Sequence, residues 1–411
     1  MKKKRVKEVI DNDNHFDPNE AKIEMIKLLI PLGLDAIKEV LEEEVNHLAG
    51  ERYRHNGGDI KRWGKNNGSV YLGNQKVKMK VPRVRNTTEG VEVPLESYNA
   101  FQSERPIDDS ILSMVINGVS TRKYEKVVTK IPETFGIKSN SISKKFIKSS
   151  SKRLKELLER DLSQDDIVAI FMDGKTFAEN DIVIALGVDI DGNKSILGFV
   201  ETSTENTIVI KRFVRELVDR GLKIDDEILF VIDGAKGLKK GIKSILKEKA
   251  MVQRCQWHKR ENIVAYLPKN EQKRIRKKLQ DAYNCSTYKS AMAELNKIKK
   301  ELKLMNESAV ASLEEGLEET LTLHKLSLYK ELGTSFKTTN CIENINRQME
   351  QYTGRVCYWK NSNQRQRWVA TALLEIEPKL RKVKGHKYLK TLRERMRQIN
   401  ERAINSEKKV A

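Results

Sequence analysis

Three short apolar runs near the middle of the chain predict three consecutive strands. The runs cover residues 167–173, 182–190 and 195–200, and polar turns at 179–181 and 191–193 separate them. Runs of this length that are bounded by Asn, Asp or Gly are typical of buried strands joined by hairpins. We therefore expect an antiparallel three-stranded unit here.

Beyond the third strand the pattern changes to alternating helices and strands. Amphipathic spacing predicts helices at residues 206–220 and 236–249, and apolar runs predict strands at 228–233 and 251–255. Three hairpin-linked strands followed by alternating helices and strands are the element order of the ribonuclease-H-like fold. We predict an α/β core of this class, whose first part spans residues 161–258.

Predicted helices follow the first part of the core. Residues 259–335 are rich in Lys and nearly free of Gly, which predicts an all-α insertion. Residues 336–411 are expected to add a last core helix and a basic helical tail.

The region before the core is expected to be mainly helical. Residues 1–50 predict a helical segment whose spacing is interrupted at Pro31 and for which Gly50 is the C-terminal stop. Residues 107–160 predict a helix, a Gly-containing turn and a polar, basic second helix, the outline of a DNA-binding helix-turn-helix. A plain helical hairpin connecting two domains is the alternative.

A basic β-hairpin region is predicted between these helical parts, over residues 51–106. Residues 69–83 alternate apolar and basic positions about a Gly-Asn turn, so that Lys76, Lys78 and Lys80 share one face. This face suits a DNA backbone, or it belongs to a solvent-facing strand whose lysines protect an edge. Both interpretations are open.

The formal net charge of +20 is distributed in blocks. Residues 51–160 carry 23 Lys/Arg against 12 Asp/Glu and residues 239–303 carry 19 against 6, whereas residues 161–238 carry 8 against 16. Basic segments around an acidic one suit a protein that contacts phosphates at many points and concentrates carboxylates where cations bind. Double-stranded DNA is the predicted partner.

Cysteine content and hydropathy predict the compartment. Four cysteines without a CxxC pair are too few and too irregularly spaced for a disulfide framework. No apolar run approaches the roughly 20 residues that span a bilayer, and the N-terminus lacks the apolar stretch of a signal peptide. We expect a cytoplasmic protein without a membrane partner.

Two acids end apolar strands of the predicted core. Asp173 ends the first strand in FMDGKTF and Asp233 ends the fourth in VIDGAKGL, so that neighbouring strands bring both to one edge of the sheet. By the logic of this fold a third acid comes from a later helix, and Glu343 in TTNCIENINRQME is the candidate. Each acid alone is more commonly a turn, cap or solvated residue, so the prediction depends on all three.

Carboxylates gathered in this way predict a site for divalent cations. Mg²⁺ prefers hard oxygen ligands, and two such ions can activate a nucleophile and stabilise the departing oxygen in phosphodiester chemistry. We predict two Mg²⁺ ions, with Mn²⁺ as an alternative, held by Asp173, Asp233 and Glu343.

Cys255 and His258 form a Cys-x-x-His pair at the end of the fifth predicted strand. A structural zinc site would need two further ligands, and the other histidines offer no matching pair. We instead expect a buried thiol packed beside Trp257, and a histidine that forms hydrogen bonds near the acids or contacts the reacting phosphate.

Further basic and aromatic residues are candidate DNA contacts. Residues 355–368 interleave Trp and Tyr with Arg and Lys, which permits base stacking together with phosphate pairing. Trp359 and Trp368 are alternatively core anchors. The full candidate set is Lys76, Lys78, Lys80, Arg83, Arg85, Arg122, Lys123, Ser143, Lys144, Lys145, Arg347, Arg355, Trp359 and Lys360.

The motifs resemble those of the bacterial Mutator-like insertion-sequence transposases. The resemblance runs from about Arg52 to near Arg397 and is strongest in DGKTF, VIDGAKGL, QRCQWHK and TTNCIENINR, in this order. It implies a DDE triad at Asp173, Asp233 and Glu343 that depends on Mg²⁺, together with the family's Cys-x-x-His signature. It also implies recognition of terminal inverted repeats by the N-terminal region and a homodimer or higher oligomer in a synaptic complex on bacterial DNA.

The predicted activity is transposition. It comprises metal-dependent cleavage at the end of an insertion sequence and attack of the freed 3′-hydroxyl on target DNA. Two alternatives are a nuclease or resolvase of the same fold that never joins strands, and a DNA-binding regulator whose acids are structural.

Overall fold

The computed structural model describes residues 18–54, 58–72, 75–102, 139–202, 206–354, 356 and 358–410. The chain divides into two compact units, Met1–Phe146 and Ile147–Ala411, which have separate hydrophobic cores.

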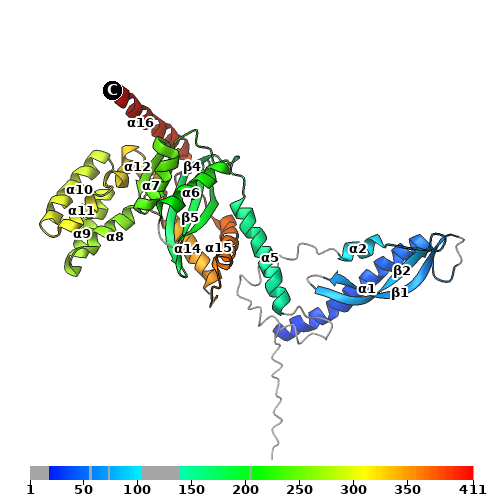
Figure 1. Ribbon diagram of the computed structural model, residues 1–411. Coiled ribbons are helices and arrows are strands. Elements are labelled where there is room, and N and C mark those ends of the chain that lie inside the picture. Colours follow the sequence, from blue (N-terminus) through cyan, green and yellow to red (C-terminus); the bar gives the residue numbers. More distant parts are fainter. Residues whose placement is uncertain are drawn as a thin grey trace, which may run out of the picture. The chain divides into compact units, whose positions relative to one another are not determined.

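The first unit packs a β-ribbon on one long helix (Figure 1). Its elements are α1 (Pro18–Ala49), β1 (Ile60–Leu72), β2 (Gln75–Asn86), β3 (Val91–Val93) and α2 (Glu96–Gln102). Ile37, Leu41 and Val45 of α1 bury their side chains with Val70 and Val84 of the ribbon. The predicted hairpin is confirmed and is longer than expected, and β3 and α2 were not predicted.

The predicted interruption at Pro31 is wrong, because α1 continues through this residue. A proline inside a helix removes one backbone hydrogen bond, and packing of the following turns on the ribbon outweighs this loss. The predicted stop at Gly50 is confirmed: its φ is 79°, and its N–H donates to the carbonyl of Asn46 at 2.9 Å.

Helix α5 (Ser139–Leu158) corresponds to the second helix of the predicted helix-turn-helix. The first helix and the turn fall within residues 103–138, which lie outside the described residues. The helix-turn-helix therefore stays a prediction.

The second unit contains a five-stranded mixed sheet. Its strands are β4 (Ile167–Phe177), β5 (Asn180–Asp189), β6 (Lys194–Thr202), β7 (Ile228–Ile232) and β8 (Ala250–Arg254), in the order β6-β5-β4-β7-β8. The first three strands are antiparallel, whereas β7 and β8 continue parallel to β4. All five strands were predicted.

One predicted strand end is wrong. β4 does not end at Asp173 but continues to Phe177, because its antiparallel pairing with β5 extends to Phe177 and Asn180. Its parallel pairing with β7 stops earlier, at Met172 and Ile232. Asp173 therefore lies where one side of β4 has already lost its neighbour.

Helices cover both faces of the sheet (Figure 1). On one face, α6 (Thr207–Asp219) and α7 (Lys236–Leu246) bury apolar residues against Ile170, Met172 and Phe230. On the other face, α14 (Asn340–Thr353), α15 (Ser362–Ile376) and α16 (Leu389–Val410) pack with Phe171 and its neighbours. The alternation of strand side chains separates these two cores.

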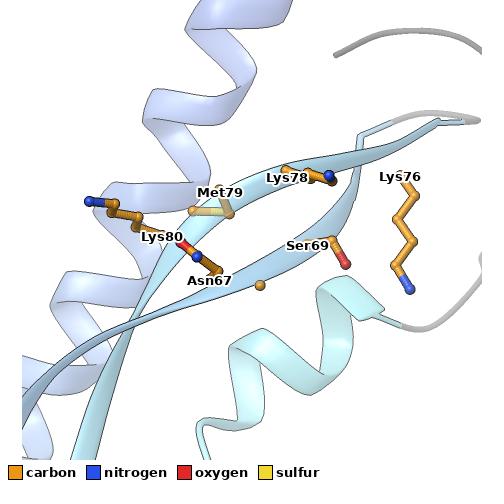
Figure 2. Close-up of a pocket in the computed structure, with 7 residues that line it drawn as sticks. Asn67, Ser69, Lys76, Lys78, Met79 and Lys80 are labelled. Carbon is orange, nitrogen blue, oxygen red and sulfur yellow. The ribbon is translucent and has the colours of Figure 1, made fainter.

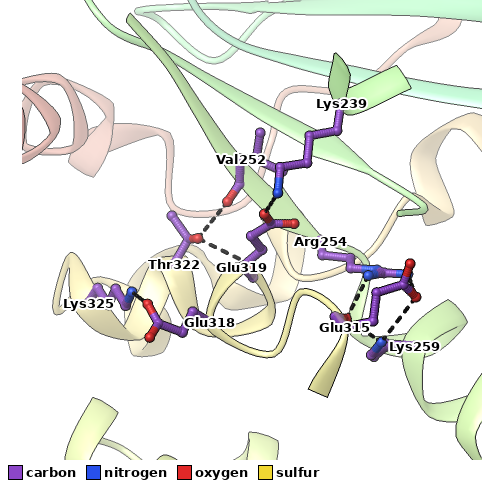
Figure 3. A network of polar contacts seen from close by, with 9 residues as sticks. All are labelled: Lys239, Val252, Arg254, Lys259, Glu315, Glu318, Glu319, Thr322 and Lys325. Atoms are coloured by element: carbon purple, nitrogen blue, oxygen red, sulfur yellow. Dashed lines mark hydrogen bonds and ion pairs between the residues drawn. The ribbon is translucent and has the colours of Figure 1, made fainter. Parts of the chain in front are cut away.

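Between β8 and α14 the described chain contains only helices and turns. The longer helices are α8 (Gln256–Ala265), α9 (Lys269–Tyr283), α10 (Tyr288–Lys303) and α11 (Glu307–Glu314), followed by α12 (Thr322–Lys325) and α13 (Tyr329–Phe336). The segment from α8 to α11 has its own core. Thr322 attaches the segment to the sheet by donating to the carbonyl of Val252 at 2.6 Å (Figure 3).

None of the helices described here has the length and apolar character needed to span a membrane.

We expect Leu332→Ala to lower the free energy of unfolding by about 2–5 kcal/mol, because it leaves a cavity in the core beneath α14. Leu332 is fully buried. The matched control is Leu304→Ala, since Leu304 is 90% exposed and its loss should cost less than about 0.5 kcal/mol. Urea unfolding followed by circular dichroism measures both, and equal destabilisation would contradict the core assignment.

Candidate active site

Strand pairing places Asp173 next to Asp233. In the parallel register of β4 and β7, Met172 pairs with Ile232, so each acid directly follows a paired residue. Phe171 packs in the core beneath α14, and side chains two residues apart share a face of a strand. Asp173 therefore faces the side of the sheet that carries α14, and only 5% of it is exposed.

The end of β8 and the start of α8 bring the Cys-x-x-His pair to the same edge. Cys255 is fully buried, as predicted, and its N–H donates to the carbonyl of Ile232 at 2.7 Å. His258 Nε2 lies 3.9 Å from Glu343 Oε1. Trp257 is 42% exposed, and its ring meets that of His258 edge-on, with 4.8 Å between centroids.

The first turn of α14 supplies the third acid. The N–H of Glu343 donates to the carbonyl of Thr339, the N-cap residue, at 3.2 Å. Glu343 Oε1 is buried and has no hydrogen-bond partner among the described residues. The structure thus brings Asp173, Asp233, Glu343 and His258 together, and charge interactions couple them.

Thr339 is a member of this site that was not predicted from the sequence. It is fully buried, forms a hydrogen bond with Asp173, and places its Oγ1 3.4 Å from His258 Nδ1. Its only sequence signal is its position just before the helix that carries Glu343, which is typical of an ordinary cap. The threonine links an acid on a strand to a histidine on another helix.

Burial and like charge oppose ionisation of Asp173. Desolvation raises the pKa of its carboxyl most, the neighbouring Asp233 and Glu343 raise it further, and the pKa reaches about 7 despite the hydrogen bond from Thr339 and the charge of His258. A carboxyl with this pKa is only partly ionised at neutral pH. A cation beside it would restore the charged form.

His258 has the opposite tendency. Burial lowers the pKa of its imidazole, but a hydrogen bond with Cys255 and the charges of Cys255, Asp173 and Asp233 outweigh burial and raise the pKa to about 9. A ring with this pKa is mostly protonated at neutral pH and places a positive charge beside the acids.

The carboxylates suit a cation but do not enclose one as they stand. Among the residues that the structure describes, no three His, Cys, Asp or Glu side chains are close enough together to hold a metal ion. The raised pKa of Asp173 and the oxygen of Glu343 that has no hydrogen-bond partner among the described residues nevertheless fit the donor set that hard divalent cations prefer.

Three of the predicted DNA contacts surround a pocket on the polar face of the hairpin (Figure 2). Lys76, Lys78 and Lys80 of β2, with Asn67 and Ser69 of β1, line about 750 Å³. No carboxylate of the described residues lines this pocket. The opposite face of the hairpin is buried on α1, so the lysines are held on the exposed side.

Two other predicted DNA contacts on the hairpin are engaged inside the unit. Arg83 forms a two-pronged ion pair with Glu92, with Nη2 to Oε2 at 2.9 Å. Arg85 donates to the carbonyl of Gly90 at 2.7 Å, and its guanidinium lies 5.0 Å from the ring centroid of Trp63.

The remaining predicted DNA contacts are scattered. Trp359 packs against Phe177 and Trp368, with centroid distances of 4.9 and 6.1 Å, which favours the core-anchor interpretation. Lys144, Arg347 and Lys360 are exposed and Ser143 is half-buried. Arg122, Lys123, Arg355 and the side chain of Lys145 lie outside the described residues.

We expect Asp173→Asn to lower the pKa of His258 below about 9, because the substitution removes one of the negative charges that stabilise the imidazolium. Titration of the His258 ring protons by NMR, without added metal, measures the shift. The control Asp191→Asn changes the same charge in the β5–β6 turn and should leave the titration unchanged. An unchanged His258 in both variants would contradict the coupling.

Known proteins match the chain over most of its length. Residues 7–382 match the model of the family described as "Transposase, Mutator family". The transposase for IS256 in Tn4001 of Staphylococcus aureus is 27% identical over 317 residues, which cover 73% of this chain and 77% of that protein. The transposase for ISRM5 of Rhizobium meliloti is 26% identical over 309 residues, covering 73% and 75%. This chain therefore belongs to the Mutator family of transposases.

Proposed function

We propose that the protein moves an insertion sequence by cutting DNA at the terminal inverted repeats and joining the freed 3′-hydroxyl end to target DNA. The observation that carries this proposal is the convergence of Asp173, Asp233 and Glu343 around His258, in a chain of a transposase family. A ribonuclease-H-like core of the DDE type is supported by the sheet topology. Strands β4, β5 and β6 are antiparallel, and β7 and β8 extend the sheet parallel to β4.

Asp173, Asp233 and Glu343 would hold two Mg²⁺ ions, or Mn²⁺ in their place. Bound there, the ions would supply an activated oxygen nucleophile and stabilise charge on the reacting phosphate. The unpartnered Oε1 of Glu343 and the raised pKa of Asp173 support this assignment.

The protein's own groups at this edge bind and orient the reacting phosphate. His258 carries a proton at neutral pH and can donate a hydrogen bond to a phosphate oxygen. Thr339 and Cys255 both form hydrogen bonds with the imidazole, and Cys255 is fully buried. Thr339 and Cys255 are positioning residues in this scheme.

The lysine-lined pocket of the hairpin supports DNA binding by the N-terminal region. Three ammonium groups without an acid in the pocket lining are arranged to contact successive phosphates. Two element ends must be joined in one reaction, so a homodimer or higher oligomer on the bacterial chromosome forms part of the proposal.

Asp173→Asn, Asp233→Asn and Glu343→Gln should each reduce cleavage of terminal-repeat DNA with Mg²⁺ by at least about 10³-fold, because each removes a charged ligand needed in the transition state. DNA binding should persist, since repulsion of phosphate is relieved. Labelled DNA analysed by denaturing gels and band shifts separates the two effects.

Matched controls for these variants are Asp191→Asn and Glu307→Gln; Glu307, like Glu343, lies in the first turn of its helix. Both should cut at the wild-type rate. Full activity in any active-site variant would remove that residue from the site. Cleavage without joined products by the wild type would indicate the nuclease alternative, and binding without cleavage would indicate the regulator.

Lys78→Gln combined with Lys80→Gln should weaken DNA binding and lower the slope of log affinity against log salt by about 2, because two counterion-releasing contacts are lost. The control is Lys38→Gln with Lys65→Gln in the same unit, since these lysines are paired with Asp35 and Glu42 at 2.6 and 3.7 Å. Fluorescence anisotropy over a salt series measures both slopes. A wild-type slope in the Lys78→Gln, Lys80→Gln variant would show that these two lysines do not contact DNA.

A further inference from the structure

A second basic pocket lies at the same end of the sheet as the proposed active site, on the face that carries α7. It has a volume of about 290 Å³ and is lined by the turn after β7, by α7, by the end of β8 and by the segment after α11. Gly234, the residue after Asp233, is part of its lining. The pocket therefore begins one residue from a proposed catalytic acid, although it contains none of the three acids.

Helix α7 directs four lysines toward this pocket. Lys236, Lys239, Lys240 and Lys243 all line it, and their spacing of three and four residues places them on one face of the helix. The opposite face is apolar and buried on the sheet and α6. Amphipathic packing thus fixes the direction of the lysine face.

Arg254 adds a buried positive charge. It pairs in register with Ile232 at the end of β8, and only 5% of it is exposed. Its Nη1 donates to the carbonyl of Glu315 at 2.7 Å, whereas its Nε has no partner among the described residues. A buried guanidinium is costly unless its charge is matched, and here the match is incomplete.

Two glycines make room for this arginine. A Cβ on Gly234 would lie 1.9 Å from Arg254 Nε, and one on Gly316 would lie 2.6 Å from Nη1. Both glycines also have positive φ, of 106° and 66°. The backbone on both sides of the guanidinium is therefore shaped to accept it at the pocket.

The acids in the pocket leave positive charge in excess. Five basic side chains line the pocket against two carboxylates, Glu315 and Glu319. Glu319 is paired with Lys239 (Figure 3), and Glu315 Oε2 lies 3.4 Å from Arg254 Nη2. Lys240 and Lys243 are exposed and take part in no ion pair between described residues.

The start of α7 adds a further attraction for anions. Ala235 is its N-cap residue and offers no side-chain hydrogen bond to the first turn. The N–H of Ala235 donates to Asp233 Oδ1 at 2.9 Å, and the positive end of the helix dipole at this place favours a negatively charged ligand. A tetrahedral oxyanion suits both this helix end and the lysine face.

We propose that this pocket, built by α7, Arg254 and the two glycines, binds a backbone phosphate of the DNA strand next to the one being cut. The inference rests on the proposed function, because it takes the cut phosphate to lie at Asp233. Phosphates of one strand are spaced about 3.4 Å along the duplex axis, so a strand at Asp233 carries its next phosphates past Gly234 and α7. The pocket thereby sets the register of the DNA relative to the acids.

Neutral phosphates in the DNA test this assignment. Single phosphates around the cleavage point are replaced by methylphosphonates, and binding is measured for the wild type and for Lys240→Gln with Lys243→Gln. At one position next to the cut, the methylphosphonate should weaken DNA binding by the wild type on the order of tenfold. The same methylphosphonate should not weaken DNA binding by the double variant any further.

The matched control is Lys211→Gln with Lys223→Gln, which removes the same charge from exposed lysines outside the pocket. This control should keep the full methylphosphonate effect. Loss of the effect in both variants, or no sensitive position in the wild type, would overturn the proposal. All four substitutions are at exposed positions, so folding should be unaffected, which circular dichroism checks.

Two further measurements separate the sources of failure. The first measurement is binding of inorganic phosphate, followed by ³¹P NMR. If phosphate binds the wild type but not the pocket variant, and no DNA position is sensitive, the pocket is a site for free phosphate and the DNA assignment is overturned. Cleavage of the same DNA by the wild type tests the proposed function alone. If the wild type cleaves the DNA but the methylphosphonate effect is the same in the wild type and the pocket variant, only the pocket assignment is rejected. If the effect is lost in the pocket variant but the wild type does not cleave, the pocket is supported and the proposed transposition is rejected.

Discussion

The burial of Asp173 beside Asp233 is the constraint on which the arrangement of the second unit depends. The parallel pairing of β4 with β7 brings Asp173 next to Asp233, and the burial of Asp173 limits the screening of their interaction by water. The ring of His258, whose pKa is raised to about 9, provides the compensating positive charge. Cys255 and Thr339 then follow as necessary parts, because they hold that ring against the acids.

The two hydrophobic cores on either face of the sheet position different parts of the candidate site. The core under α6 and α7 is a compact backing that fixes β4, β7 and β8 in register. The core under α14, α15 and α16 decides where Glu343 is placed, because Ile342 and Ile345 anchor the helix on either side of it. An acid on a helix can therefore meet acids that lie far earlier in the chain.

Local sequence pattern was sufficient for the five strands, whereas the choice of the three acids needed the order of the elements and, for Glu343, the logic of the fold. A buried strand can be predicted from a few consecutive apolar residues, and an acid that follows such a run marks the place where the strand reaches solvent. The extension of β4 past Asp173 was missed because it depends on pairing with β5, and the continuity of α1 at Pro31 because it depends on packing against the ribbon. Thr339 and Arg254 were missed for the same reason, since their roles arise from contacts with residues distant in sequence.

The glycine pair around Arg254 has a consequence for the evolution of such chains. Gly234 lies in the turn after β7 and Gly316 in the helical segment, yet both leave space for the same guanidinium. A chain that lost the segment between α8 and α13 would leave Arg254, at the end of β8, without the carbonyl and carboxylate of Glu315 that it contacts. Deleting or exchanging this segment would thus require a simultaneous change at Arg254, so the two parts are expected to be inherited as one block.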